Sequence, residues 1–257
     1  MGYSHAYFSG NVQPWLDAGW LAKGQRLIEF GAQEFFSNPE ETRREIHEFL
    51  TRHGYDPLVA DGIVGGRLPR VHLVYEMLGI DYTAIDVDDA LGSTFFDLNT
   101  QAVPEEWIGK FDFVNDEGTV EHLVNPINCF HVAHDLTKVG GVIRHSFPLI
   151  GWREHGFMYP TTKFCAHLVG DNGYEVLQAE VRFTGHTPFD DPLFKLAEPA
   201  PPVTDMWAFL IYRKTRDQPF VIPVDHVGGD TPTRSRQRLR EHYDKVAKTR
   251  LKTDAVT

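Results

Sequence analysis

The sequence predicts an α/β fold built on a doubly wound, seven-stranded, mostly parallel sheet. Three observations predict it: apolar strand-like runs alternate with helical stretches, glycines follow several of these runs, and the runs end in acids or amides. The chain has 257 residues, which suffices for one large domain with a sizeable core. We therefore expect helices on both faces of the sheet and a ligand site outside the carboxyl ends of its strands.

The first strand is expected at residues 26–30, and the turn Gly31-Ala32-Gln33 follows it directly. Residues 34–68 then form a helical insertion, which could act as a lid because it leaves the sheet at its ligand edge. Its helix is expected from about 37 to 52, since Ser37 or Asn38 can cap it and Pro39 suits the first turn. A second helix is expected at 69–78, ended by Gly79.

The remaining strands and helices alternate. The strands are expected at residues 82–88, 94–98, 111–115 and 142–147, the last ended by Pro148. The helices are expected at residues 125–138 and 161–172. Two final strand-like runs, 175–183 and 206–213, have no helix between them, so we expect a hairpin that adds an antiparallel strand at one edge.

Composition excludes several classes of protein. The chain has 25 Lys plus Arg and 36 Asp plus Glu, a net charge of −11, which argues against a nucleic-acid binder. Only two cysteines, Cys129 and Cys165, are present, so a disulfide framework is excluded and a reducing compartment is indicated. No apolar run approaches the ~18 residues of a membrane span, and no secretory signal is recognisable. We expect a cytoplasmic protein that makes no contact with a membrane.

The charge is divided unevenly along the chain. Residues 231–257 contain eight basic residues and three acids, a net charge of +5, so residues 1–230 carry −16. We expect residues 1–230 to form the single domain and the basic tail to be an amphipathic, solvated helix. The tail could also fold back on the acidic domain, contact a second copy of the chain in a homo-oligomer, or bind an anionic ligand.

Four pieces of sequence, in this order, resemble the class I S-adenosylmethionine-dependent methyltransferases over residues 24–213. They are the turn Glu29-Phe30-Gly31-Ala32-Gln33, the strand end Ala84-Ile85-Asp86-Val87-Asp88, the run Phe96-Asp97-Leu98, and FDFVNDEGTVEHLVNPINCFHVAHDLTKVGG at 111–141. The resemblance implies a Rossmann-like sheet and S-adenosylmethionine as the cofactor. The stretch from His145 to Tyr174 resembles a subgroup found beside carbohydrate and natural-product genes.

The resemblance also implies where the cofactor lies. Its methionine end would meet Glu29, Gly31, Ala32 and Gln33, and Asn115 ends a neighbouring strand at the same edge. Asp86 would accept both ribose hydroxyls, while Asp97 and Leu98 would contact the adenine by a hydrogen bond and an apolar contact. The sequence departs from the family in two ways: the turn keeps a single glycine, and Asp86 lies 55 residues beyond Gly31 instead of ~20, a gap that the insertion explains.

Two histidines are candidates for the general base that a hydroxyl acceptor requires. His145 ends the fifth strand, and His155 follows in the aromatic loop LIGWREHGFMYP. Histidine, with an ordinary pKa near ~6.5, suits this role, and Glu117 or Glu121 could orient the base or the substrate. Neither histidine is excluded from a purely structural role. No local motif encodes a metal site, and we expect none, with the helical pair His131 and His134 serving packing or surface roles.

The expected function is methyl transfer to a small-molecule acceptor, with a hydroxyl of a sugar or secondary metabolite as the first choice. One alternative is a methyltransferase-like domain without catalytic activity, kept as a scaffold or partner subunit. A second alternative, a nucleotide-dependent oxidoreductase, is disfavoured by the single glycine and by the late position of Asp86.

Overall fold

The computed structural model describes residues 2–56, 58, 71–88, 90–152, 155–187, 203–225, 237–239, 241–243 and 245. Its main sheet has seven strands. In order across the sheet these are β5 (Thr94–Phe95), β4 (Asp81–Asp86), β2 (Arg26–Phe30), β6 (Phe111–Glu117), β7 (Thr137–Ile150), β9 (Val203–Arg213) and β8 (Glu175–Thr187).

The predicted fold class is confirmed. The strands from β5 to β7 are parallel to one another, and β9 runs antiparallel to both of its neighbours, β7 and β8. The predicted hairpin is therefore present, with β9 as the antiparallel strand and β8 outside it at the edge. The strand order reverses between β2 and β6, and in open α/β sheets a ligand binds at such a point, outside the carboxyl ends of the strands.

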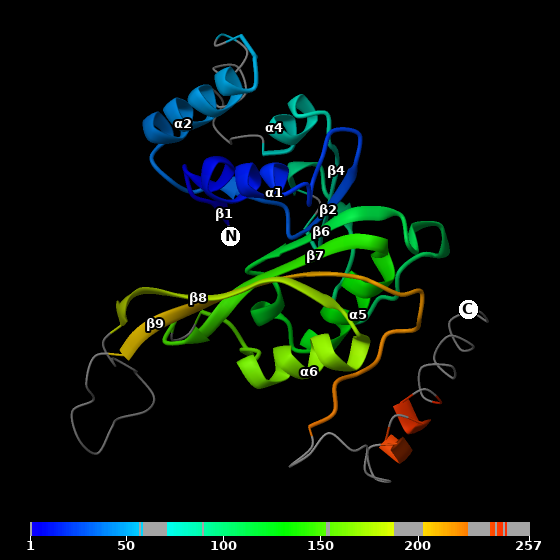
Figure 1. Cartoon of the computed structure of the whole chain (residues 1–257). Coiled ribbons are helices and arrows are strands. Elements are labelled where there is room, and N and C mark those ends of the chain that lie inside the picture. The colour runs from blue at the N-terminus through cyan, green and yellow to red at the C-terminus, as the bar shows by residue number, and fades with distance from the viewer. Residues whose placement is uncertain are drawn as a thin grey trace.

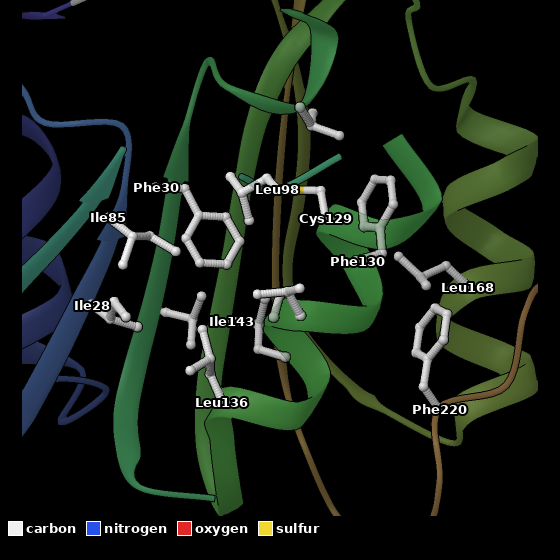
Figure 2. Packing of buried hydrophobic residues seen from close by; sticks show 14 of the residues in the cluster. Ile28, Phe30, Ile85, Leu98, Cys129, Phe130, Leu136, Ile143, Leu168 and Phe220 are labelled. Carbon is white, nitrogen blue, oxygen red and sulfur yellow. The ribbon is translucent and has the colours of Figure 1, made fainter. Parts of the chain in front are cut away.

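Helices cover both faces of the sheet (Figure 1). One face carries α1 (Gln13–Asp17), α2 (Pro39–Arg52) and α4 (Val71–Met77), and the other carries α5 (Pro126–Leu136) and α6 (Thr162–Asn172). Strand side chains alternate between the two faces: Leu27 packs with the first group, whereas Ile28 joins the second. Figure 2 shows this second core, where Phe30 and Ile143 of the sheet meet the α5 side chains.

The predicted helix ends are present where the sequence supplies a cap. Asn38 Oδ1 accepts from the backbone N–H of Glu40 at 2.9 Å, and Pro39 occupies the first turn of α2. Helix α6 is capped by Thr161, and Gly173 ends it in the left-handed conformation, with a φ of 62°. Helix α4 lies within the range that the sequence predicted.

The strand β7 is longer than predicted at both ends. It begins directly after α5 and includes Gly140 and Gly141. Gly140 N donates to Lys214 O at 2.7 Å, and Lys214 N donates back to Gly141 O at 3.0 Å. Pro148 does not end the strand, because it faces Trp207 of β9 just before an irregularity in the register. A proline at a bulge sacrifices no regular ladder bond, so the strand continues to Ile150.

The N-terminal segment was not predicted. A short strand β1 (Gly2–Tyr3) pairs with β3 (Glu34–Phe35), and the helical turn η1 (Phe8–Val12) leads into α1. Its aromatic side chains are buried in the core on the α2 side of the sheet; they are Tyr3, Tyr7, Phe8 and Trp15. The N-terminus therefore forms an integral part of one helical layer.

Two predictions extend outside the described residues. The first half of the insertion is α2, but residue 57 and residues 59–70 are not described, so the lid is untested. Of the basic tail at 231–257, residues 231–236, 240, 244 and 246–257 are also outside the described ranges, whereas 237–239, 241–243 and 245 are helical. In the ranges that are described, no helix is both long and apolar enough to cross a membrane.

Candidate cofactor and acceptor site

A pocket of about 260 Å³ lies at the carboxyl ends of β2, β4 and β5. This is the position at which open α/β sheets bind nucleotides. The pocket is lined by Gly31, Ala32, Gln33, Ile85, Asp86, Val87, Phe96, Leu98, Asn99, Thr119, His122 and Leu123. The structure thus brings together five of the predicted cofactor residues, namely Gly31, Ala32, Gln33, Asp86 and Leu98.

The glycine turn is fixed between two neighbouring elements. Gly31 has a φ of 78°, a conformation that favours glycine, and its N–H donates to Ile85 O at 2.8 Å. A Cβ at this position would lie 3.0 Å from Thr119 Oγ1. Thr119 is itself held by a 2.7 Å bond to Phe30 O. A single glycine therefore suffices here, because it is the one residue of the turn with a positive φ.

Gln33 presents an unused acceptor to the pocket. The side chain is buried, and its Nε2 donates to Gly31 O at 3.3 Å. Its Oε1 has no hydrogen-bond partner among the described residues. Buried polar atoms in folded proteins are rarely left unpaired, so Oε1 fits a ligand that carries an N–H donor, such as the ammonium group of a methionine moiety.

Asp86 closes the other side of the turn. Its Oδ2 accepts from Ala32 N at 2.8 Å and its Oδ1 from Asp88 N at 3.2 Å. A carboxylate has about four acceptor positions, so both oxygens can still receive ribose hydroxyls. Next to it, Ile85, Phe96 and Leu98 supply the apolar surface that an adenine ring requires. These residues fit S-adenosylmethionine.

The described pocket lining includes Leu98 but not Asp97, whose hydrogen bond to the adenine stays a prediction. The Asp97 carboxylate accepts from Thr100 Oγ1 at 2.6 Å and from Asn99 N at 2.9 Å, and these bonds, the first above all, lower its pKa. Asp97 thus stabilises the turn that follows β5. Asn99 lines the pocket instead, and its Oδ1 accepts from Val124 N at 2.9 Å.

Glu29 and Asn115 also lie elsewhere than predicted. Both are fully buried on the α2 side of the sheet, where Glu29 accepts from Tyr3 Oη and, at 2.6 Å, from Asn115 Nδ2. Burial raises the pKa of Glu29 to about 8. The error has a simple cause: alternate residues of a strand face opposite sides, so a position near a strand end does not by itself reach the ligand edge.

The buried network extends from these residues to Glu117. Asn115 Oδ1 accepts from Arg144 Nη1 at 2.8 Å, and Arg144 forms an ion pair with Glu117. The guanidinium also lies 5.2 Å from the centre of the Trp15 ring. Glu117 is therefore the partner of a buried cation, and the structure gives no support to its predicted role in orienting a catalytic base.

The base hypothesis is corrected for His145. Its side chain has no exposed surface, Nδ1 lies 2.7 Å from Asp116 Oδ2, and Nε2 lies 3.0 Å from Tyr212 Oη. A base must reach the proton that it removes. With both ring nitrogens occupied inside the core, His145 has a structural role.

His155 and Glu121, by contrast, are brought together. His155 Nε2 lies 3.5 Å from Glu121 Oε1, and His122 Nε2 lies 4.0 Å from the same oxygen. The Glu121 side chain has no exposed surface, whereas 26% of the His155 side chain is exposed. Burial raises the pKa of Glu121 to about 9, with nearby Asp116 acting in the same direction, and burial lowers the pKa of both histidines.

The loop after β7 is fitted closely against Glu121. The N–H groups of Phe157 and Met158 donate to Glu121 O at 2.7 and 3.1 Å. A Cβ on Gly156 would lie 2.7 Å from the same carbonyl oxygen, so the approach requires glycine. Trp152, with a φ of 49°, packs its ring 5.3 Å from the His155 ring. This loop forms an aromatic wall beside the pocket.

Sequence reasoning missed several of these residues. Thr119 and His122 lie in the segment that the resemblance singled out, so their position two and five residues after Glu117 was an available signal. Trp207, whose ring lies 4.9 Å from that of Trp152, gave no signal, since only the pairing of β9 with β7 brings it there.

The fold and pocket define the class of protein: a Rossmann-like α/β domain with a nucleotide-type pocket at the switch point of its sheet. No protein-family model matches the chain, and no curated protein matches it.

Solved structures give distant similarities. The chain is similar to a candidate sarcosine dimethylglycine methyltransferase from Galdieria sulphuraria, with 10% identity, a TM-score of 0.48, and coverage of 82% of this chain and 85% of that one. A SAM-dependent methyltransferase from Archaeoglobus fulgidus is 10% identical, with a TM-score of 0.43 and coverage of 80% of this chain and 94% of that one. Phosphoethanolamine N-methyltransferase 2 from Haemonchus contortus, solved with S-adenosyl-L-methionine, is 10% identical, with a TM-score of 0.46 and coverage of 81% of this chain and 53% of that one. Because all three TM-scores are below 0.5, the fold assignment depends on the strand order of the sheet and not on these similarities.

Proposed function

We propose that the chain is an S-adenosylmethionine-dependent methyltransferase that acts on a small molecule, with a hydroxyl of a sugar or secondary metabolite as the acceptor. The observation that carries the proposal is the pocket at the switch point, where the Gly31 turn, Gln33, Asp86 and Leu98 converge. Three of these groups each match one part of the cofactor: the Gln33 amide oxygen suits the ammonium group, the Asp86 carboxylate suits the ribose, and the apolar Leu98 suits the adenine.

The chain's own residues bind and align the reactants. When bound, the cofactor supplies an activated methyl group, so holding the acceptor in line contributes most, up to ~7–11 kcal/mol in well-oriented systems. His122 belongs both to the pocket lining and to the Glu121–His155 group. The acceptor hydroxyl is therefore expected between the pocket and the aromatic wall, where Trp152 and Trp207 would exclude water.

The choice of a small molecule follows from charge. The net charge of −11 disfavours a nucleic-acid acceptor, as does the lack of a basic run outside the tail. A cytoplasmic location and a homo-oligomer formed through the basic tail stay predictions. Sedimentation of the full chain beside a version shortened after residue 230 tests the second.

Calorimetry with three ligands tests the proposal. The wild-type chain should bind S-adenosylmethionine and S-adenosylhomocysteine but not NAD. Asp86→Asn should weaken binding ~10- to 100-fold, the loss expected for charge-assisted hydrogen bonds of ~1.5–3 kcal/mol. The matched control is Asp81→Asn, at the opposite end of β4, where the carboxylate contacts only Arg26 among the interactions described, at 3.2 Å. It should leave the affinity unchanged.

The alternatives make different predictions in the same experiment. A chain that binds none of the three ligands supports a scaffold without catalytic activity, and a chain that binds NAD alone supports an oxidoreductase. A chain that binds S-adenosylmethionine is then incubated with methyl-labelled cofactor and a pool of cytosolic small molecules. Label transfer to a hydroxylated metabolite identifies the acceptor class.

A further inference from the structure

Four polar atoms converge beside the cofactor pocket without partners. They are both carboxylate oxygens of Glu121 and the Nε2 atoms of His122 and His155. All four are buried, and none has a hydrogen-bond partner within the part of the chain that the structure describes. Native proteins leave few such atoms unsatisfied, and a cluster of them indicates a missing ion, water or ligand.

We propose that Glu121, His122 and His155 bind a divalent transition-metal ion that activates the acceptor hydroxyl. The binding site stands on geometry alone, whereas its role in activation rests on the proposed methyltransferase function. The proposal replaces a metal-free general base with a bound cation. It gives one role to three residues, two of which, His155 and Glu121, were expected to be a base and the carboxylate that orients it.

The distances suit a metal. One atom from each side chain can be chosen so that all lie within 4.8 Å of one another, with 3.5 and 4.0 Å between Glu121 Oε1 and the two imidazole nitrogens. Ligand atoms ~2.0–2.2 Å from a tetrahedral zinc ion lie roughly 3.3 Å apart. Small side-chain rotations therefore close the site, whereas 3.5 and 4.0 Å are too long for good direct hydrogen bonds.

The electrostatics favour a cation. Glu121 is fully buried, and the carboxylates of Asp116 and Glu117 act on it with the same sign. Burying a carboxylate without a counter-charge is costly unless it is paired or coordinates a metal. Among the ion pairs described, Glu121 is paired with two imidazoles and with no Lys or Arg, and the N-terminal charge is the last and smallest of the effects on its pKa. A divalent cation would supply the counter-charge that this buried carboxylate requires.

The ligand set selects the kind of ion. Two imidazoles and one carboxylate suit Zn²⁺, Fe²⁺ or Mn²⁺, whereas Mg²⁺ and Ca²⁺ prefer oxygen ligands alone. Three protein ligands also leave a coordination position open for a substrate, as in catalytic zinc sites. His122 is shared with the pocket lining, so this position lies next to the bound cofactor.

The cation would accelerate the proposed reaction by making the acceptor a better nucleophile. A hydroxyl bound to a divalent metal loses its proton to water at a much lower pH than a free one. Its oxygen then forms a bond to the methyl carbon, the S–C bond breaks, and its electron pair stays on sulfur, which becomes a neutral thioether. No oxidant or reductant is required.

Metal content and binding test the site independently of activity. The full chain is freed of metal with a chelator and titrated calorimetrically with Zn²⁺, Mn²⁺ and Mg²⁺, and Co²⁺ binding is followed by its visible absorption. We expect stoichiometric binding of Zn²⁺ and Co²⁺, in preference to Mg²⁺. Glu121→Gln and His155→Asn should each weaken Zn²⁺ binding by more than the ~10- to 100-fold typical of losing an outer-sphere partner.

His131→Asn is the matched control, because it removes a half-exposed histidine, 3.2 Å from Asp135, on another helix. It should leave Zn²⁺ affinity unchanged, and circular dichroism confirms that all three variants fold. A wild-type chain that binds none of these ions overturns the proposal, as does equal loss in the control.

Cofactor calorimetry on the same samples keeps the two proposals distinguishable. S-adenosylmethionine binding without metal binding rejects the metal site and supports His155 as a base, leaving the proposed function standing. Metal binding without cofactor binding rejects the methyltransferase function but supports the site.

Discussion

The buried histidine of α5, His134, makes stability depend on pH in a calculable way. Its Nε2 lies 2.7 Å from Gln218 O, and its Nδ1 lies 2.6 Å from Tyr174 Oη. Because a carbonyl oxygen can only accept, Nε2 carries the proton, and the tyrosine hydroxyl donates to Nδ1. A second proton on the ring would turn the tyrosine hydroxyl into the acceptor of that bond and would place a buried charge near Lys214.

The magnitude follows from the pKa. Burial, with the Lys214 charge acting in the same direction, lowers the pKa of His134 from 6.5 to about 4. The unfolded chain therefore binds one more proton than the folded chain between these pH values. The associated stability, about 3 kcal/mol, is fully present above pH 6.5 and is lost as the pH falls toward 4.

Urea unfolding of His134→Gln, followed by circular dichroism from pH 7 to pH 4.5, tests this assignment. The variant should be less stable than wild type at pH 7, because it loses two buried hydrogen bonds, but its free energy of unfolding should fall less on acidification. His131→Gln, on the same helix but half-exposed, should change the slope much less, because His131 is the smallest of the causes that lower the pKa of His134. The reasoning is refuted if His134→Gln retains the full wild-type dependence on pH.

Three further predictions concern the sheet edge and its surroundings. Gly31→Ala should weaken S-adenosylmethionine binding, because its Cβ would meet Thr119 Oγ1 at 3.0 Å. The control Gly24→Ala is also at a positive φ but has open space around it, so it should change only the melting temperature. Calorimetry measures the first effect and thermal melts the second. The raised pKa of Glu29 gives the wild type a stability that is present at low pH and is lost as the pH rises through about 8. Glu29→Gln cannot ionise, so its stability relative to wild type should increase over this range. Thermal melts at pH 6 and pH 9 check this. Gly156→Val should lower methyl transfer with little change in cofactor affinity, because its Cβ would lie 2.7 Å from Glu121 O and displace the loop. Equal loss of activity and affinity would contradict the proposed separation of the acceptor position from the cofactor pocket.

The elements that could be predicted are those whose signals are local. The strand at residues 26–30 matches β2 residue for residue, and the cap at Asn38 was visible as a side chain next to a proline. The N-terminal aromatic residues carried a signal too, because Tyr7, Phe8, Val12 and Trp15 recur at helical spacing. The full length of β7 was not predictable, since its ends depend on pairing with β9, far along the chain.

The site could be predicted only in part, for a geometric reason. Gly31, Gln33 and Asp86 line the pocket because they stand at or just after the carboxyl ends of strands, although their contact with a cofactor stays a prediction. Glu29 and Asn115 were expected at the ligand edge, but side chains along a strand face opposite sides of the sheet in turn. Both side chains lie on the α2 side, where they are buried. His155 and Glu121 lie 34 residues apart, and their contact depends on a loop folding back along the sheet.

Trp152 of the aromatic wall and Trp207 of β9 give the candidate site an optical property. Their rings lie edge to face, 4.9 Å apart, and both are within about 6 Å of His155. Indoles at this separation couple electronically, and a nearby transition metal or a changed imidazole charge alters their emission. The chain thus carries a chromophore pair beside the proposed acceptor position, so binding there can be followed in the ultraviolet without a label.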